Sequence, residues 1–179
     1  RPEGISTGSS KNEDALIHAV DYMFEKYKFS TDIVVNLQPT SPLREVGLVD
    51  DCLSAMVRES CDSLLTVSKS TPFFWRKSEI GLSATYDYVN RPMRQQLNIN
   101  DYMLFDNGNL YSVDKEVLFK SHCRIGQKPY LYEIDKYHSL QIDDYQDFIV
   151  LETIAKALGI CKERLNLVIW MPRVALTIW

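Results

Sequence analysis

The sequence predicts an α/β fold with a mostly parallel sheet. Two amphipathic helical patterns, at 13–27 and about 46–58, alternate with two short apolar strands, at 31–38 and 62–68. Such alternation is typical of parallel strands joined by right-handed helical crossovers. The chain has 179 residues, 45% of them hydrophobic, so it is long enough to bury one core without a metal or a disulfide staple.

Both of these helices are indicated by apolar residues that recur at the helical period. Ser10 and Glu13 have the spacing of a capping box at the start of the first helix, which continues to Tyr27. The strand TDIVVNLQ stands between the two helices, and DSLLTVS follows the second. The predicted order is therefore helix, strand, helix, strand.

The alternation breaks between residues 70 and 105. This polar stretch has no helical period, yet aromatic residues crowd it, among them Phe73, Phe74, Trp75, Tyr86, Tyr88 and Tyr102. Exposed apolar groups gathered in this way mark interaction surfaces. We therefore predict an insertion at 70–105 whose aromatic residues pack against a partner, such as a second subunit in a homodimer.

The C-terminal half returns to regular elements. They are a strand and a helix within 107–121, a strand at 128–135, and a helix at 143–159. Gly159 is the expected stop signal of the last helix. Residues 1–160 thus form one predicted domain, and 161–179 form an atypical hydrophobic tail that resembles a strand pair broken at Pro172.

Composition excludes several classes of function. A net charge of −4 argues against a nucleic-acid-binding surface. No apolar run approaches the roughly 20 residues that a membrane helix requires. The cysteines are far apart and form no CxxC pair, which argues against a zinc site or a small disulfide framework: Cys52, Cys61, Cys123 and Cys161. We therefore expect a cytoplasmic protein with reduced thiols.

A polar run follows the first predicted strand directly. The segment VNLQPTSPLR at 35–44 begins apolar and then presents an amide at Gln38, two hydroxyls and a guanidinium. In open α/β sheets, ligands bind outside the carboxyl ends of strands, where such groups can read a sugar or a base. Alternatively, Pro39 and Pro42 make a stiff turn and the hydroxyls cap the next element of the chain.

Three further polar segments each have a functional and a purely structural interpretation. In RPMRQQL, Arg91 and Arg94 offer guanidinium groups suited to a carboxylate, or they line a solvated loop. In DNGN at 106–109, Asn107 is placed to hold a polar ligand, but the hairpin turn is the stronger prediction.

The third of these segments joins a predicted strand to the last predicted helix. In LQIDDYQDF, Asp143 and Asp144 are candidate Mg²⁺ ligands, or N-caps of the helix. The residues alone leave both interpretations open.

Taken in order, these motifs resemble the acylneuraminate cytidylyltransferases, which make CMP-activated nonulosonic acids such as CMP-sialic acid. The resemblance covers residues 1–158 and is carried by LQPTSPLR, RQQ, NG-x-x-Y and IDDYQDF. It implies a Rossmann-like nucleotidyltransferase fold with three layers and a homodimer whose insertion helps to close the partner's active site. It also implies that the sugar's anomeric hydroxyl attacks the α-phosphorus of CTP and releases pyrophosphate.

The resemblance also assigns roles to individual residues. Gln38 corresponds to the glutamine near the acceptor sugar, while Arg94, Asn107 and Tyr111 correspond to residues that surround the nonulosonic acid. Asp143 corresponds to a Mg²⁺-binding aspartate of the active site, and is the implied catalytic residue.

Two departures from the family pattern bear on activity. Gln141 stands where the family has a first metal-binding aspartate, and a neutral amide is a poorer Mg²⁺ ligand. The family's glycine-rich CTP-binding segment has no counterpart before the first predicted helix, so the chain resembles an N-terminally truncated member. We therefore expect weak or no turnover by this chain alone. The alternative is a non-catalytic dimeric domain, derived from the family, for sugar binding or assembly.

Overall fold

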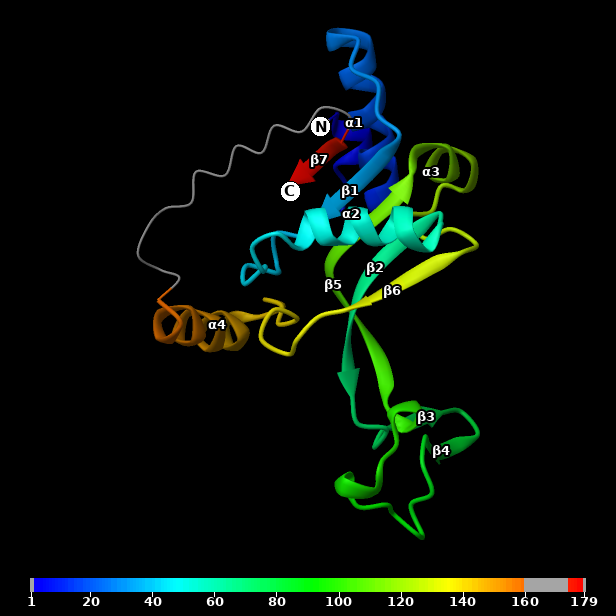
Figure 1. Ribbon diagram of the computed structural model, residues 1–179, viewed down its shortest axis with the longest axis vertical. Coiled ribbons are helices and arrows are strands. Elements are labelled where there is room, and N and C mark those ends of the chain that lie inside the picture. The colour runs from blue at the N-terminus through cyan, green and yellow to red at the C-terminus, as the bar shows by residue number, and fades with distance from the viewer. Residues whose placement is uncertain (1, 160–173, 179) are drawn as a thin grey trace.

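The computed structural model describes residues 2–159 and 174–178, and its centre is a five-stranded sheet (Figure 1). In spatial order the strands are β6 (Pro129–Glu133), β2 (Ser63–Ser70), β5 (Met103–Asp114), β1 (Ile33–Leu37) and β7 (Val174–Ile178). The α-helices are α1 (Asn12–Tyr27), α2 (Leu48–Glu59), α3 (Lys115–Ser121) and α4 (Tyr145–Ala157). Three short 3₁₀ turns lie at Glu3–Ile5, Arg94–Gln96 and Ile99–Asp101. The predicted α/β class is confirmed.

The prediction of a mostly parallel sheet is wrong. The central strand β5 runs antiparallel to both of its neighbours, β2 and β1, and only the outer pairings of β6 and β7 are parallel. The reason is the long excursion between β2 and β5. It reverses the chain, so β5 returns along β2 without a helical crossover, as the two members of a hairpin do.

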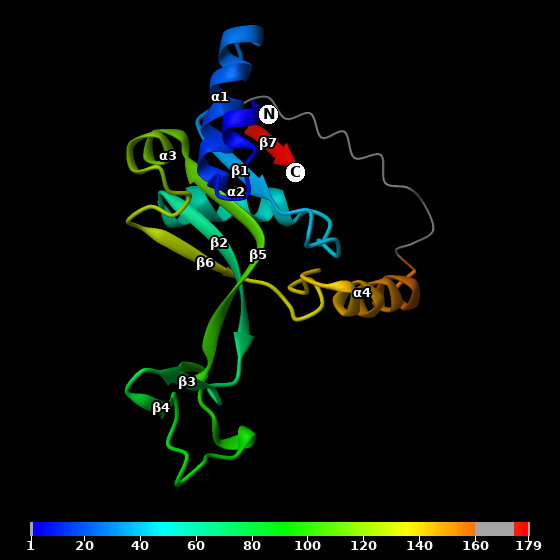
Figure 2. The same ribbon diagram turned by 180° about the vertical axis from the view of Figure 1, so that it is seen from behind.

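Helices cover both faces of the sheet. Val34 packs among apolar residues of α1 and α3, and the next residue, Val35, packs among those of α2. Successive strand residues point to opposite faces, so this short strand contributes to two separate cores. Figure 1 shows α2 in front of the sheet, and Figure 2 shows α1 and α3 on the opposite face. These are the three layers that the resemblance implies.

The sequence patterns are wrong at the start of α1 and right at the end of α4. The capping box at Ser10 and Glu13 is wrong, because α1 is capped by Lys11 with no side-chain bond, and Ser10 Oγ instead accepts from the amide of Thr7 at 3.1 Å. After the last helix, α4, Gly159 has a φ of +70°. Glycine adopts this conformation without steric cost, so the predicted stop is confirmed.

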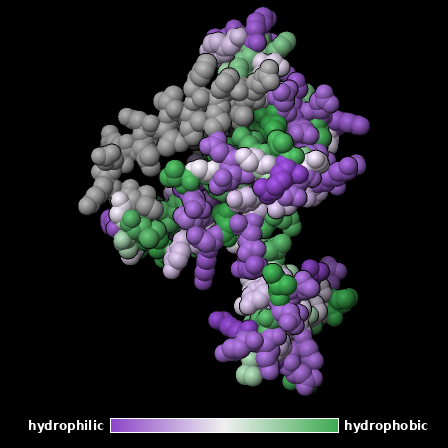
Figure 3. Space-filling model, viewed as in Figure 1, coloured by the Kyte–Doolittle hydropathy of each residue, from purple (hydrophilic) through white to green (hydrophobic). Residues whose placement is uncertain are grey.

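Residues 71–102 form a lobe at the end of the β2–β5 ribbon (Figures 1 and 2). It contains the hairpin of β3 (Trp75–Ser78) and β4 (Gly81–Ala84), and we call it the insertion lobe. Hydrophobic and hydrophilic side chains are mixed on its surface (Figure 3). Ile80 is fully exposed and Leu82 is 70% exposed, so this lobe has little core of its own.

The described residues cover only part of the predicted tail. Strand β7 lies within it and pairs in parallel with β1, from Ile33 opposite Val174 to Leu37 opposite Ile178. Pro172 and the first of the two predicted tail strands lie outside the described residues. None of the helices in the described part of the chain has the length and hydrophobicity that a membrane span requires.

Candidate functional site

The loop after β1 folds back onto β5 through the guanidinium of Arg44. Arg44 Nε donates to Asn109 Oδ1 at 2.8 Å, and Nη2 donates to the carbonyl oxygens of Asn109 at 3.0 Å and Gln38 at 3.2 Å. Burial lowers the pKa of Arg44, although an arginine stays protonated in a protein. None of the ion pairs among the described residues includes this guanidinium. The hydrogen bonds that this guanidinium donates therefore go to neutral oxygen acceptors.

Strand β5, which this guanidinium contacts, has a β-bulge in its pairing with β2. The pairing of the two strands moves from Tyr111 to Asp106 across a single intervening residue of β2, so residues 107–110 form the bulge. Gly108 has a φ of +64°, which a residue with a side chain rarely adopts. The hairpin turn predicted from DNGN is therefore wrong, because the same residues form a bulge within one strand.

The side chain of Asn107 is bonded in the bulge through its oxygen and not through its nitrogen. It is fully buried, and its Oδ1 accepts from Thr66 Oγ1 at 2.8 Å and from the Asn109 amide at 3.1 Å. Its Nδ2 has no hydrogen-bond partner in the described part of the chain. Leaving a buried donor unpaired costs roughly 1–3 kcal/mol, so such a group calls for an acceptor from a ligand or a water molecule.

Two further amides converge on the bulge at Gly108. A Cβ atom at this position would lie 2.6 Å from Gln141 Nε2 and 2.7 Å from Gln38 Oε1. Gln38 comes from the end of β1, and Gln141 comes from the segment before α4. The structure thus brings the predicted residue Gln38 to Gly108, the chain neighbour of the predicted Asn107, and adds Gln141. We call Gln38, Arg44, residues 107–109 and Gln141 the polar cluster.

Tyr111 is buried next to the bulge and is linked to it through Asp106. Its side chain is buried, its hydroxyl donates to Asp106 Oδ1 at 2.8 Å, and the Arg124 guanidinium lies 4.3 Å from the ring centre. The same Asp106 oxygen accepts from the amide of Gly108 at 3.1 Å. Burial, followed by the bond to Asp106, raises the pKa of the Tyr111 phenol.

The acidic pair before α4 divides into a cap and an exposed residue. Asp144 Oδ1 accepts from the Asp147 amide at 2.9 Å, so the N-cap interpretation of Asp144 is confirmed. Asp143 is exposed, and its amide donates to Asp147 Oδ2 at 3.0 Å. Magnesium prefers several hard oxygen ligands, and within residues 2–159 and 174–178 no group of three or more His, Cys, Asp or Glu side chains gathers. Asp143 and Gln141 alone do not fit a Mg²⁺ site, and we assign no step to a metal.

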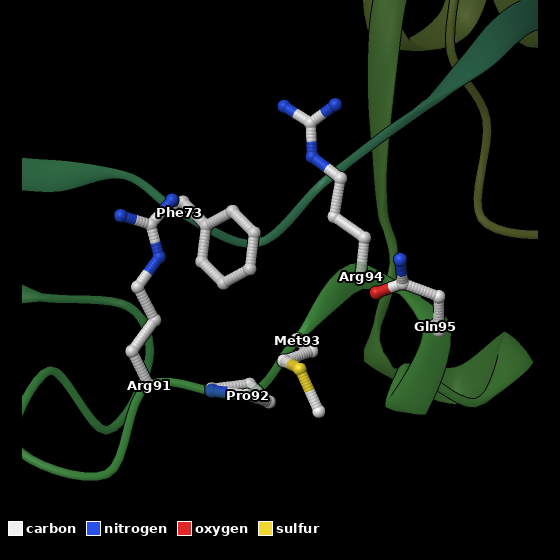
Figure 4. Close-up of a pocket in the computed structure, with 6 residues that line it drawn as sticks. All are labelled: Phe73, Arg91, Pro92, Met93, Arg94 and Gln95. Atoms are coloured by element: carbon white, nitrogen blue, oxygen red, sulfur yellow. The ribbon is translucent and has the colours of Figure 1, made fainter.

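Arg94 lies in a different place, in an open pocket of about 320 Å³ on the insertion lobe (Figure 4). The Arg91 guanidinium stacks 4.3 Å above the centre of the Phe73 ring, whereas Arg94 begins a 3₁₀ turn. Neither arginine takes part in an ion pair with another described residue. The pocket is positively charged and is lined by Phe73, Arg91, Pro92, Met93, Arg94 and Gln95.

The two predicted parts of the sugar site are therefore separated within one chain. The insertion lobe lies at one end of the β2–β5 ribbon, and β1 with α2 lies at the other (Figures 1 and 2). Arg94 belongs to the lobe, whereas Gln38 and Asn107 belong to the polar cluster.

The chain matches no protein-family model. It is 26% identical over 157 residues to N-acylneuraminate cytidylyltransferase A of Danio rerio, a match that covers 85% of this chain. The chain is a distant homologue of this cytidylyltransferase. The resemblance drawn from the motifs is thereby confirmed. The match spans 34% of the length of the relative.

Three residues of this chain were not assigned an individual role in the site from the sequence. They are Arg44, Thr66 and Asn109, which hold the polar cluster in place. Arg44 belongs to LQPTSPLR and Asn109 to NG-x-x-Y, so their place in these motifs could have marked them as site residues. Thr66 is an ordinary strand residue, and nothing in its neighbourhood marks it.

Proposed function

We propose that this chain supplies the acid-sugar site of a cytidylyltransferase that joins CTP to a nonulosonic acid such as sialic acid. One observation carries the proposal: Asn107 keeps a buried, unpaired Nδ2 donor, and the amides of Gln38 and Gln141 converge on the next residue, Gly108. An amide both donates and accepts, so Gln38 and Asn107 are suited to sugar hydroxyl and amide groups. The distant homology supports the same substrate class.

In the proposed reaction the anomeric hydroxyl of the sugar loses its proton to the solvent, and its oxygen bonds to the α-phosphorus of CTP. The bond from that phosphorus to the bridging oxygen of the β-phosphate breaks, and pyrophosphate leaves. The polar cluster would bind the sugar and fix the direction of the attacking hydroxyl. Holding the reacting atoms in this geometry is a major source of rate enhancement.

Arg94 would complete this site from a second copy of the chain. A guanidinium binds a carboxylate through two parallel hydrogen bonds, which suits an acidic sugar. Arg94 of the same chain lies on the far lobe, and that lobe also exposes large apolar side chains, among them Trp75, Ile80, Leu82 and Tyr88. A homodimer would bury these side chains and bring one copy's lobe to the other copy's polar cluster. Sedimentation should then give about twice the 20.7 kDa chain mass, and a strict monomer would refute the shared site.

A non-catalytic sugar-binding or assembly domain is the second candidate. It is favoured by Gln141. The resemblance implies a metal-binding carboxylate at this position, whereas the neutral amide present here lies against Gly108. In this version the polar cluster binds the sugar and no bond is made.

Titration calorimetry with sialic acid tests both versions. Gln38→Ala should abolish the binding heat without unfolding the protein, because Arg44 is bonded to the main-chain oxygen of Gln38 and not to its side chain. Gln127→Ala removes an exposed glutamine side chain and should bind like the unmodified protein. Identical isotherms for Gln38→Ala and the unmodified protein would overturn the sugar site.

Adding CTP and Mg²⁺ to the same samples separates the two candidates. Release of pyrophosphate that depends on the sugar would establish the enzyme. Sugar binding without any release would leave the second candidate.

A further inference from the structure

We propose that Arg44 is a positioning residue of the sugar site. Its guanidinium joins the end of β1 to the bulge of β5, and so sets the separation between the Gln38 and Asn107 amides. The inference rests on the proposed function of the polar cluster, and it adds to that function a residue that would not touch the substrate.

The bonding pattern of Arg44 requires a planar fork. Nε and Nη2 donate side by side to the Oδ1 and main-chain oxygen of Asn109, and Nη2 also reaches the main-chain oxygen of Gln38. A lysine has the same charge but a single nitrogen, so it cannot satisfy acceptors on both segments with this geometry. The arrangement therefore depends on the shape of the guanidinium and not only on its charge.

Asn109 extends the same connection to a third segment. Its Nδ2 donates to the main-chain oxygen of His138 at 2.6 Å, in the loop that leads to Gln141. The amide of Ile142 also donates to the main-chain oxygen of Thr40 at 2.8 Å. The three segments that present the converging amides are thus bonded to one another through the buried Asn109.

A purely structural role would not call for a partly buried cation. Burial penalises the charged form of Arg44, and no carboxylate of the described residues offsets that penalty. An apolar side chain would fill the same space without this cost. What an apolar residue could not do is hold two backbone segments at a fixed spacing.

The test compares Arg44→Lys with Arg58→Lys, a change at an exposed arginine that pairs with Glu59. Side-chain amide resonances of Gln38 and Asn107 are followed by NMR, together with the sialic acid Kd and the unfolding midpoint. Arg44→Lys should shift or broaden these resonances, and weaken sugar binding by about tenfold, as expected when ligand-binding groups lose their fixed geometry. Arg58→Lys should change neither.

The amide resonances decide the inference whether or not the sugar binds. Resonances of Gln38 and Asn107 that stay unchanged in Arg44→Lys would overturn it. If the unmodified protein binds no sialic acid, the proposed function fails, while the NMR comparison still tests Arg44. Should Arg44→Lys not fold, Arg44→Met takes its place, because it keeps an unbranched apolar stem and removes the partly buried charge. Amide resonances in Arg44→Met that match those of the unmodified protein would equally contradict the inference.

Discussion

The polar cluster and the insertion lobe both carry predicted sugar-binding residues, but they are built in opposite ways. In the polar cluster, Arg44 and Asn109 are bonded across 65 residues of sequence, and Asn109 and Asn107 are fully buried. In the insertion lobe, side chains bond to near neighbours, as Asp87 does with Asn90, or across the β3–β4 hairpin. The polar cluster is therefore organised by the fold itself, whereas the lobe presents its groups outward.

Aromatic packing shows the same contrast. Tyr111, beside the polar cluster, is buried in a core cluster with Leu65 and Val67, and its ring contacts Arg124. The aromatic rings of the lobe contact one another. Tyr86 packs against the rings of Phe73 and Trp75, and Trp75 also packs against Tyr88. Trp75 is still 52% exposed. A lobe whose aromatic residues remain exposed is suited to a partner surface, and a preformed cluster is suited to a small polar ligand.

The largest expected effect is on the polar cluster itself, from Gly108→Ala. The alanine would have to adopt a positive φ, and its Cβ would collide with the Gln38 and Gln141 amides. We therefore expect a loss of about 2–4 kcal/mol in the free energy of unfolding. Urea unfolding measures it. Gly8→Ala is the control, because nothing lies within 4 Å of a Cβ there. Equal stability of the two variants would mean that the amides do not converge on residue 108.

Arg94→Ala should affect binding without affecting stability. Losing a charge-assisted pair with a carboxylate weakens sialic acid binding by at least about tenfold, and the unfolding midpoint should not move. Calorimetry and thermal unfolding give the two values. Arg76→Ala removes another exposed arginine of the lobe and should bind normally. Unchanged affinity in Arg94→Ala would show that the carboxylate is held elsewhere.

Gln141→Asp should give the site a metal-binding character that the described residues lack. A second carboxylate near Asp143 offers Mg²⁺ another hard oxygen ligand, so the affinity for Mg²⁺ should rise by about tenfold. Titration with MgCl₂ followed by calorimetry measures the change. Gln127→Asp adds the same charge at an exposed position, and an equal rise there would show a nonspecific effect of charge.

Tyr111→Phe should have the smallest effect. The hydroxyl bonds to Asp106, so its removal should cost about 0.5–1.5 kcal/mol of stability and change the sugar affinity only a few-fold. Tyr88→Phe, at an exposed lobe position, should leave stability unchanged. A large loss of sugar affinity in Tyr111→Phe would show instead that this hydroxyl touches the ligand.

Local patterns predicted the regular elements because their causes are local. The strand around Val34 and Val35 is apolar on both faces, as a strand covered by helices must be. The direction of β5 was not predictable in this way, because a strand pattern does not encode which way the chain runs after a long insertion. The Asn-Gly pair of DNGN was misread for a related reason: a positive φ at Gly108 suits a hairpin turn and a bulge equally.

The candidate site was predictable where a motif named it and not where distant residues make it. Gln38 and Asn107 were assigned from the resemblance of the motifs that contain them, since the residues alone left a turn open at Gln38 and favoured one at Asn107. Thr66 was not, because its part in the site depends on a bond to Asn107, 41 residues away in the sequence. The separation of Arg94 from Gln38 also required the fold, since a sequence motif carries no distance.

The central claim is that the polar cluster of one copy and the insertion lobe of another form one sugar site. Gln38→Ala and Arg94→Ala proteins, each expected to bind sialic acid at least about tenfold more weakly alone, are mixed and allowed to exchange subunits, and tight binding is measured by calorimetry. Random exchange should restore about one quarter of the sites, because half of the dimers are mixed and each of these has one intact site. No restoration after verified exchange would contradict the account, since both residues would then act within a single chain.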